Sequence, residues 1–483
     1  MKRLARVMLG SGLILAGGCQ STGTPARTVA PTALRIGLGS VDGTTEEAGL
    51  RQVVRNQAIE PLVKYGEDGR PGPSLAERWT LSPDGLRLTI QLKPALFHDG
   101  TPLRASDAVE RLKRSLPQGF GPLYRDVADI QATADSEVVI TFHRRTAFAI
   151  DFLDVQITKP SDTAIGTGPY MPGAVTAEGT ELVANTRYHA GAPTLDRILL
   201  KPYPSVRSAW ADLLRGQVDM LYEVGIDAID SLEPSSQVRL FNFRRHYLHA
   251  AIFNLQRPKL KDPALRRLMN ESIDRARLVS EALGGFGRPA TGPVWPEFWA
   301  NDAREAGFRY APQRIQGPSH ITLNCMFPSV MSERLALMLQ RQLQSVGIDL
   351  QLESVPLDEF ARRLTARDYD ILLTDALSGP TLARPYVFWH SQGPYNYGGF
   401  NSREVDAALE QVRDAENDDT YRRGVAAFQR AIANDPPAIF LAWSERARAV
   451  STSFEVRSEP GRDIVNDIHL WRPADARSTA RVN

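Results

Sequence analysis

Residues 321–376 alternate between strand and helix patterns, and this alternation limits the folds that the chain can adopt. Strand patterns, apolar or alternating, occupy 321–327, 348–355 and 369–376. In "SERLALMLQRQLQSVG" the apolar residues recur every three or four positions, which predicts a helix that Ser332 can cap at its start and Gly347 at its end. A shorter helix is expected over "LDEFARRLT". This βαβαβ order predicts parallel strands with right-handed crossovers.

The part of the chain before this segment is richer in strands. Strand patterns are found at 33–39, 86–92 and 137–143. One helix is expected to begin with Asp262 as its cap and Pro263 at its first position. Two more helices are expected near 402–415 and 419–433. At 483 residues the chain should hold two to four domains, with no low-complexity break between its halves. We therefore expect an α/β protein whose lobes share a wide interface.

The N-terminus has the pattern of an export signal. A positively charged start precedes a short apolar run, Val7 to Ala16, which is too short to cross a bilayer. Residues 1–18 are therefore expected to be a signal peptide. "AGGC" at 16–19 resembles the lipobox of bacterial lipoproteins, in which the signal is cut before the cysteine and the thiol is acylated; the alternative is a plain signal with an incidental cysteine. On the first interpretation Cys19 carries lipid, and Gln20, not being aspartate, favours the outer membrane in a host with two membranes.

The next segment and the composition bear on location and partners. Residues 19–32 are small and polar, which predicts a flexible tether. The formal net charge is +1 and no basic run is present, so nucleic acid is not an expected partner. Cys325, the second of two cysteines, lies in an apolar strand and is expected to be a small buried hydrophobe.

No catalytic motif stands out in the sequence. Metalloprotease, nucleophile-elbow, P-loop, EF-hand and C-x-x-C patterns are all missing. His246 and His249 lie in an extended segment, where this spacing places them on opposite faces, so we expect no metal site there. The aromatic stretch 385–400 is either a binding surface or a loop that its rings attach to a core. We expect no catalytic residue and no cofactor.

Several motifs in order resemble one family. The motifs are "LAERW", "DGLRL" and "FHDGTP" within 73–109, then "GTGPY" at 166–170, Asn185 with Tyr188, "FNLQRPKLKDPALRRLMNESIDR" and "GGFNSREVDAALEQ". In this order they resemble the extracellular solute-binding proteins of the peptide/nickel family, which are the receptors of ABC importers. The resemblance covers nearly all of 33–450. In "FHDGTP" we expect His98 and Asp99 to form a scaffold turn, and Ser106 or Asp107 to cap the following helix.

The resemblance implies a two-lobed, periplasmic-binding-protein fold of the large peptide-binding type, with an extra β-rich subdomain. The expected boundaries are lobe I at 33–56, 165–245 and 447–483, a β-rich insert at 57–164, and lobe II at 246–446. Hinges are expected near Arg244–Ala251 and Trp443–Arg448. Ligand would bind between the lobes and be buried by closure.

One stretch departs from the family. Peptide-binding members carry an acid for the peptide amine after the strand "YDIL" of the second lobe, and here Ser378 or Gly379 takes that position; Asp375 could replace it only in a shifted register. Because an unpaired buried ammonium is costly, free peptides are disfavoured. The expected ligand-binding residues are Asp42, Tyr247, Asn254, Asp375, Ser378, Arg384, Tyr395 and Asn396.

These observations lead to one main hypothesis of function. The resemblance implies a monomeric receptor that captures a peptide or peptide-like solute and delivers it to an ABC permease with its ATPase. It would work in the cell envelope, in the periplasm, held to a membrane through Cys19. The alternative is a non-transport lipoprotein, such as a sensor, or an enzyme on the same fold.

Overall fold

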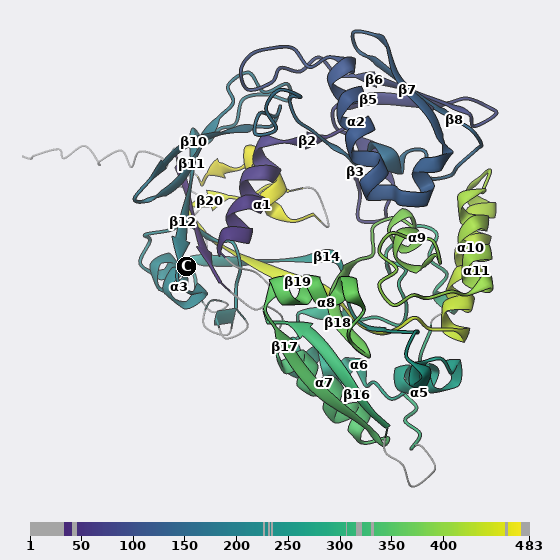
Figure 1. Ribbon diagram of the computed structural model, residues 1–483. Helices are drawn as coiled ribbons and strands as arrows, with labels where there is room; N and C mark the ends of the chain where they lie inside the picture. The colour runs from purple at the N-terminus through teal and green to yellow at the C-terminus, as the bar shows by residue number, and fades with distance from the viewer. Residues whose placement is uncertain are drawn as a thin grey trace, which may run out of the picture.

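One sheet of eleven strands runs through both lobes of this protein in the computed structural model (Figure 1). The structure describes residues 33–40, 46–225, 228–229, 232, 235–305, 307–314, 321–329, 333–458 and 462–474. The predictions for Cys19, Asp42 and Ser332 therefore lie outside the described residues. Within those ranges, no helix is long and apolar enough to cross a membrane.

The first lobe holds one end of the sheet. Its strands, in spatial order, are β10 (Tyr170–Thr176), β11 (Gly179–Ala184), β12 (Arg197–Tyr203), β1 (Ala33–Gly39) and β13 (Met220–Leu221). Strand β1 is parallel to both of its neighbours. Helices α1 (Glu46–Ala58) and α3 (Val206–Leu214), the turn η5 (Ile464–Leu470) and the pair β20 (Phe454–Glu455) and β21 (Arg472–Pro473) complete the lobe. Strand β1 begins and ends where the sequence predicts.

The second lobe confirms the βαβαβ prediction. Its elements are β16 (Ile321–Pro328), α7 (Glu333–Gln344), β17 (Ile348–Val355), α8 (Leu357–Ala366) and β18 (Ile371–Leu377). Strand β16 lies between the other two and is parallel to both. Helices α5 (Pro263–Glu271) and α6 (Arg275–Ala282) pack nearby, and Asp262 caps α5 as expected. Cys325 is fully buried, and burial raises the pKa of its thiol to about 12.

Two long strands join the lobes. Strand β14 (Val238–Phe253) and strand β19 (Ala438–Ser451) pair antiparallel in the middle of the sheet, and the short β15 (Gly287–Pro289) also pairs with β19. The pairing shifts register between Arg244 and Leu248, so three residues of β14 bulge opposite one residue of β19. Both segments predicted as hinges lie in these two strands.

The segment predicted as the insert, residues 57–164, contains a second group of strands and helices, drawn in blue at the top of Figure 1. Its sheet has the order β5 (Ala76–Leu81), β6 (Arg87–Leu92), β8 (Glu137–Phe142) and β7 (Val127–Ala134), and it is covered by α2 (Ala105–Phe120). Two short antiparallel pairs complete the segment, β2 (Glu60–Pro61) with β9 (Gln156–Ile157) and β3 (Val63–Tyr65) with β4 (Pro71–Pro73).

The hydrophobic core of this insert continues into the second lobe. One cluster of buried side chains includes Leu112 and Phe152 of the insert together with Tyr386 and Phe428. The latter come from α9 (Ala383–Trp389) and α11 (Asp418–Asn434), which pack beside α10 (Arg403–Arg413). The insert therefore packs against helices that follow it by more than 200 residues in the chain.

Scaffold positions predicted from the motifs are also confirmed. His98 Nε2 lies 3.1 Å from the carbonyl oxygen of Gly168, and Asp99 accepts the backbone N–H of Thr101. Asp107 accepts the backbone N–H that precedes α2. A Cβ at Gly168 would lie 2.3 Å from the carbonyl oxygen of Gln57, so this close approach of two backbones requires glycine.

Candidate ligand-binding cleft

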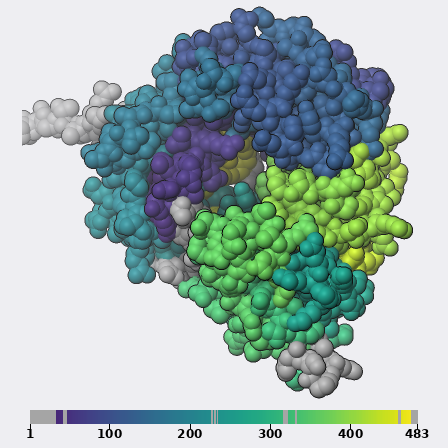
Figure 2. All heavy atoms as spheres, in the orientation of Figure 1, coloured from purple at the N-terminus to yellow at the C-terminus, as the bar shows by residue number. Residues whose placement is uncertain are grey.

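A cavity of about 350 Å³ lies where the two lobes and the insert meet. The space-filling view shows the surface hollowed between α1, the insert and the second lobe (Figure 2). Helix α1 and the residues around η5 contribute one wall, the turn after β3 a second, and the loop after β18 a third. Strands β14 and β19 contribute residues at the crossing between the lobes. This volume is in the range of pockets that bury small ligands.

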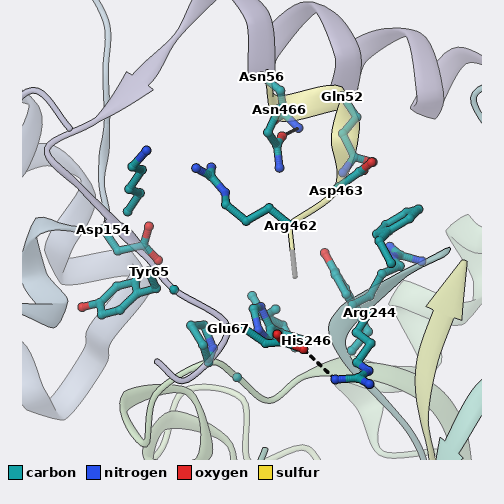
Figure 3. A pocket seen from close by; sticks show the side chains of 18 of the residues that line it. Gln52, Asn56, Tyr65, Glu67, Asp154, Arg244, His246, Arg462, Asp463 and Asn466 are labelled. Atoms are coloured by element: carbon teal, nitrogen blue, oxygen red, sulfur yellow. Dashed lines mark hydrogen bonds and ion pairs between the residues drawn. The ribbon is translucent and has the colours of Figure 1, made fainter. Parts of the chain in front are cut away.

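Charged side chains are frequent in the lining. The cations are Lys64, Arg244, Arg245, Arg384, Arg448 and Arg462, and the acids are Glu67, Asp154, Glu223 and Asp463. Figure 3 shows Arg462 reaching into the middle of the cavity, between Asn466 on one side and His246 on the other. The lining has more positive than negative groups, which favours an anion over a cation.

Each acid of the lining is already in an ion pair with an arginine. Glu67 lies 2.6 Å from Arg244, as the dashed line in Figure 3 marks. Asp154 lies 3.3 Å from Arg384, which belongs to α9. The other two acids share one arginine, described next.

Arg448 of β19 is buried between two carboxylates. Its guanidinium lies 3.3 Å from Glu223 and 2.6 Å from Asp463, and it stacks over the rings of Tyr222 and Phe243 at 3.9 and 4.4 Å. Burial alone would lower the pKa of Arg448, but the two carboxylates outweigh it and raise that pKa. This buried group joins three segments of the first lobe behind the cavity.

The bulge of β14 contributes three consecutive residues to the cavity, Arg245, His246 and Tyr247. The guanidinium carbon of Arg245 lies 4.3 Å from the centre of the Tyr247 ring. His246 packs edge-on against Trp295, and burial lowers the pKa of its imidazole to about 4, so the ring is neutral at pH 7. A regular strand would turn the middle residue away, whereas the bulge directs all three toward the cavity.

Two of the eight residues predicted to bind ligand line this cavity. They are Tyr247 and Arg384. Arg384 is paired with Asp154 and lies over the ring of Phe120. Asp42 lies outside the described residues.

The other five predicted residues do not line this cavity. Burial alone would raise the pKa of the Asp375 carboxyl, but the pair that it forms with His249 outweighs burial and lowers that pKa to about 2. Ser378 donates to the carbonyl oxygen of Pro293, and Asn254 donates to two backbone carbonyls. Asn396 hydrogen-bonds within its own loop, through Phe400 among others, and Tyr395 packs on Phe388. These side chains are engaged in holding loops and strands together.

At the position where the family pattern has an acid, the cavity is lined by Gly379. A Cβ there would lie 3.2 Å from the imidazole of His246, so glycine allows the ring to approach closely. Sequence reasoning missed Arg245 and His246 as cavity residues. The signal available was the run "RRHY" in a segment already predicted as a hinge.

Metal-binding chemistry finds no support in the described part of the chain. No group of three or more histidine, cysteine, aspartate or glutamate side chains in those ranges is arranged to hold a metal ion. His246 and His249 have separate environments, one in the cavity and one on Asp375.

Comparison with known proteins agrees with this architecture. The family described as "Bacterial extracellular solute-binding proteins, family 5 Middle" matches residues 70–399. The probable D,D-dipeptide-binding periplasmic protein DdpA of Escherichia coli is 25% identical over 428 residues, covering 80% of this chain and 82% of that protein.

Solved structures show the same fold. The oligopeptide-binding protein AppA of Bacillus subtilis, in complex with a nonapeptide, has a TM-score of 0.76 at 20% identity and covers 92% of this chain and 99% of that one. NikZ of Campylobacter jejuni, in complex with Ni(L-His), has a TM-score of 0.74 at 20% identity, with 92% and 100% covered. Since the family match spans more than half of the 483 residues, this chain belongs to the bacterial extracellular solute-binding proteins of family 5.

Proposed function

We propose that this protein is the substrate-binding receptor of an ABC importer, which captures a peptide or peptide-like solute in the cleft and presents it to the permease and its ATPase. The observation that carries the proposal is the place of the cavity. Its walls come from both lobes, and the β14–β19 pair crosses between the lobes at its edge. Relatives named for dipeptide and oligopeptide binding support the peptide-like class.

The proposed action is binding and closure, without catalysis. Rotation of the lobes about Arg244–Ala251 and Trp443–Arg448 would bury the solute, because these segments face each other across the register shift. The binding energy would go into a shift toward the closed state, which the permease recognises. The lobe boundaries of the proposal are those of the sequence prediction, with lobe II at 246–446.

The proposed location is the periplasm, with the receptor anchored through lipid on Cys19. It rests on the charged start, the short apolar run and "AGGC". A monomer suffices for this role, since one chain contains both lobes and the whole cavity.

The experiment is to purify the full chain from cells that make it and to identify a retained solute by native mass spectrometry. Solution scattering then compares the ligand-free and the loaded protein. We expect a smaller radius of gyration for the loaded form. An unchanged radius at saturating solute would contradict a receptor that closes on its ligand.

A further inference from the structure

Among the described residues, the acids that line the cavity leave no carboxylate for a ligand's ammonium group. Glu67 and Asp154 each hold an arginine, and the remaining acids of the lining, Glu223 and Asp463, share Arg448. An ammonium entering the cavity would have to break one of these pairs or remain unpaired. Either costs free energy, because a buried charge is tolerated only with a partner.

Unlike these acids, not all cations of the described lining are held in an ion pair. Among the described residues, Arg245 has neither an ion pair nor a hydrogen bond to its side chain; its contact is the ring of Tyr247. Its charge also lowers the pKa of Asp375, but the hydrogen bond of Asp375 goes to His249. The guanidinium donors of Arg245 are thus open to a ligand.

The surroundings of Arg245 suit an anion of one charge. The guanidinium presents a planar fork that matches the two oxygens of a carboxylate. The ring of Tyr247 holds the fork in place, and the neutral imidazole of His246 beside it can donate or accept a hydrogen bond. One guanidinium balances the single charge of a carboxylate, whereas a doubly charged phosphate would need a second positive charge.

From these contacts we infer that the cavity selects a small solute with a carboxylate and without an ammonium group, and that Arg245 on its Tyr247 platform binds the carboxylate. The inference rests on the proposed receptor function and names the class of solute that the receptor takes.

Four matched compounds separate the two charges. N-acetyl-dialanine has the carboxylate alone, dialanine amide the ammonium alone, dialanine both, and N-acetyl-dialanine amide neither. Calorimetric titration of the full chain with each, at up to millimolar concentration, gives the contribution of each group. We expect N-acetyl-dialanine to bind at least about tenfold more tightly than its amide, and the ammonium to weaken binding.

Three variants test the residue. Arg245→Gln should remove the preference for the carboxylate, and Arg245→Lys should retain part of it, because the charge stays but the fork is lost. Arg267→Gln changes the net charge equally on the exposed face of α5 and should leave the preference intact. Circular dichroism of each variant confirms that it is folded.

The outcomes are distinct. Tighter binding of dialanine than of N-acetyl-dialanine, a carboxylate preference that survives Arg245→Gln, or no carboxylate preference in the wild type would each overturn the inference. Closure on a solute that has an ammonium would refute the inference and leave the receptor function standing. Failure of any solute to close the protein in scattering would refute the receptor function.

Discussion

Arg384 of α9 and Asp154 of the insert form an ion pair across the edge of the cavity, with 3.3 Å between Nη2 and Oδ2. The two residues are 230 positions apart in the chain. Their side chains are 23% and 40% exposed, so solvent screens the pair. The pair links the second lobe to the insert. Arg384, which the sequence predicted to bind ligand, therefore already has a partner in the protein.

Breaking this pair should change stability little. Arg384→Gln and Asp154→Asn are each expected to cost at most about 1 kcal/mol, and the double variant should cost less than their sum because they share one interaction. Urea unfolding measures all three. Carboxylate binding should change by less than a few-fold; a complete loss in Arg384→Gln would make Arg384 the anchor instead of Arg245.

Arg448 should be far more sensitive than an exposed arginine. Arg448→Met leaves two buried carboxylates without their partner, which is expected to cost about 3–5 kcal/mol of unfolding free energy. The control is Arg457→Met, whose pair with Glu455 is about half exposed and should contribute less than about 1 kcal/mol. Equal losses in the two variants would show that the buried cluster is not stabilising.

The free energy of unfolding should decrease as the pH is lowered, and His246 should contribute to that decrease. Its pKa is about 4 in the folded protein and about 6.5 when unfolded, so below pH 6.5 the unfolded state binds more protons and is favoured. Between pH 7 and pH 5, wild type should lose up to about 2 kcal/mol more than His246→Gln.

The exposed His143 provides the control for this measurement. His143→Gln should follow wild type over the same pH range. Parallel curves for wild type and His246→Gln would show that burial does not disfavour protonation of this imidazole.

Gly168 and Gly119 should respond oppositely to alanine. Gly168→Ala places a Cβ against the backbone of Gln57 and should cost about 1–3 kcal/mol. Gly119 lies inside α2 with no atom within 4 Å of the added Cβ, so Gly119→Ala should stabilise by up to about 1 kcal/mol. Thermal unfolding of both variants tests this, and a tolerated Gly168→Ala would mean that α1 can shift.

Cys19→Ser tests the proposed anchor. The variant should accumulate as unprocessed precursor or as soluble protein, because the acylated thiol is missing. Cell fractionation and the mass of the mature N-terminus are the measurements. A serine variant that stays with membranes at the normal mature mass would rule out lipid on Cys19.

Local patterns predicted the elements of the second lobe well. Residues 348–355 alternate and the helix before them has a continuous apolar stripe, so short-range periodicity suffices to predict β17 and α7. The hinge segments were predicted from their place in the chain, where the α/β lobe should begin and end, and they lie within β14 and β19.

The site was harder to predict because it depends on contacts that are distant in sequence. No local pattern connects Arg384 with Asp154, and alternation predicts that Arg245 and His246 point to opposite faces, which the bulge prevents. Tyr395 and Asn396 have the residue types of a binding loop, but their partners are Phe388 and Phe400. The type of a residue alone does not tell whether its side chain contacts a bound ligand or a neighbouring loop.

The position of β19 in the sheet determines when the chain can finish folding. This strand pairs with β13 of the first lobe and with β14, yet it begins only at Ala438. During synthesis, more than 400 residues emerge before either lobe gains this central strand, and pairings so distant in sequence form slowly. A sheet that is completed last at its centre therefore links the final folding of both lobes to the last part of the chain.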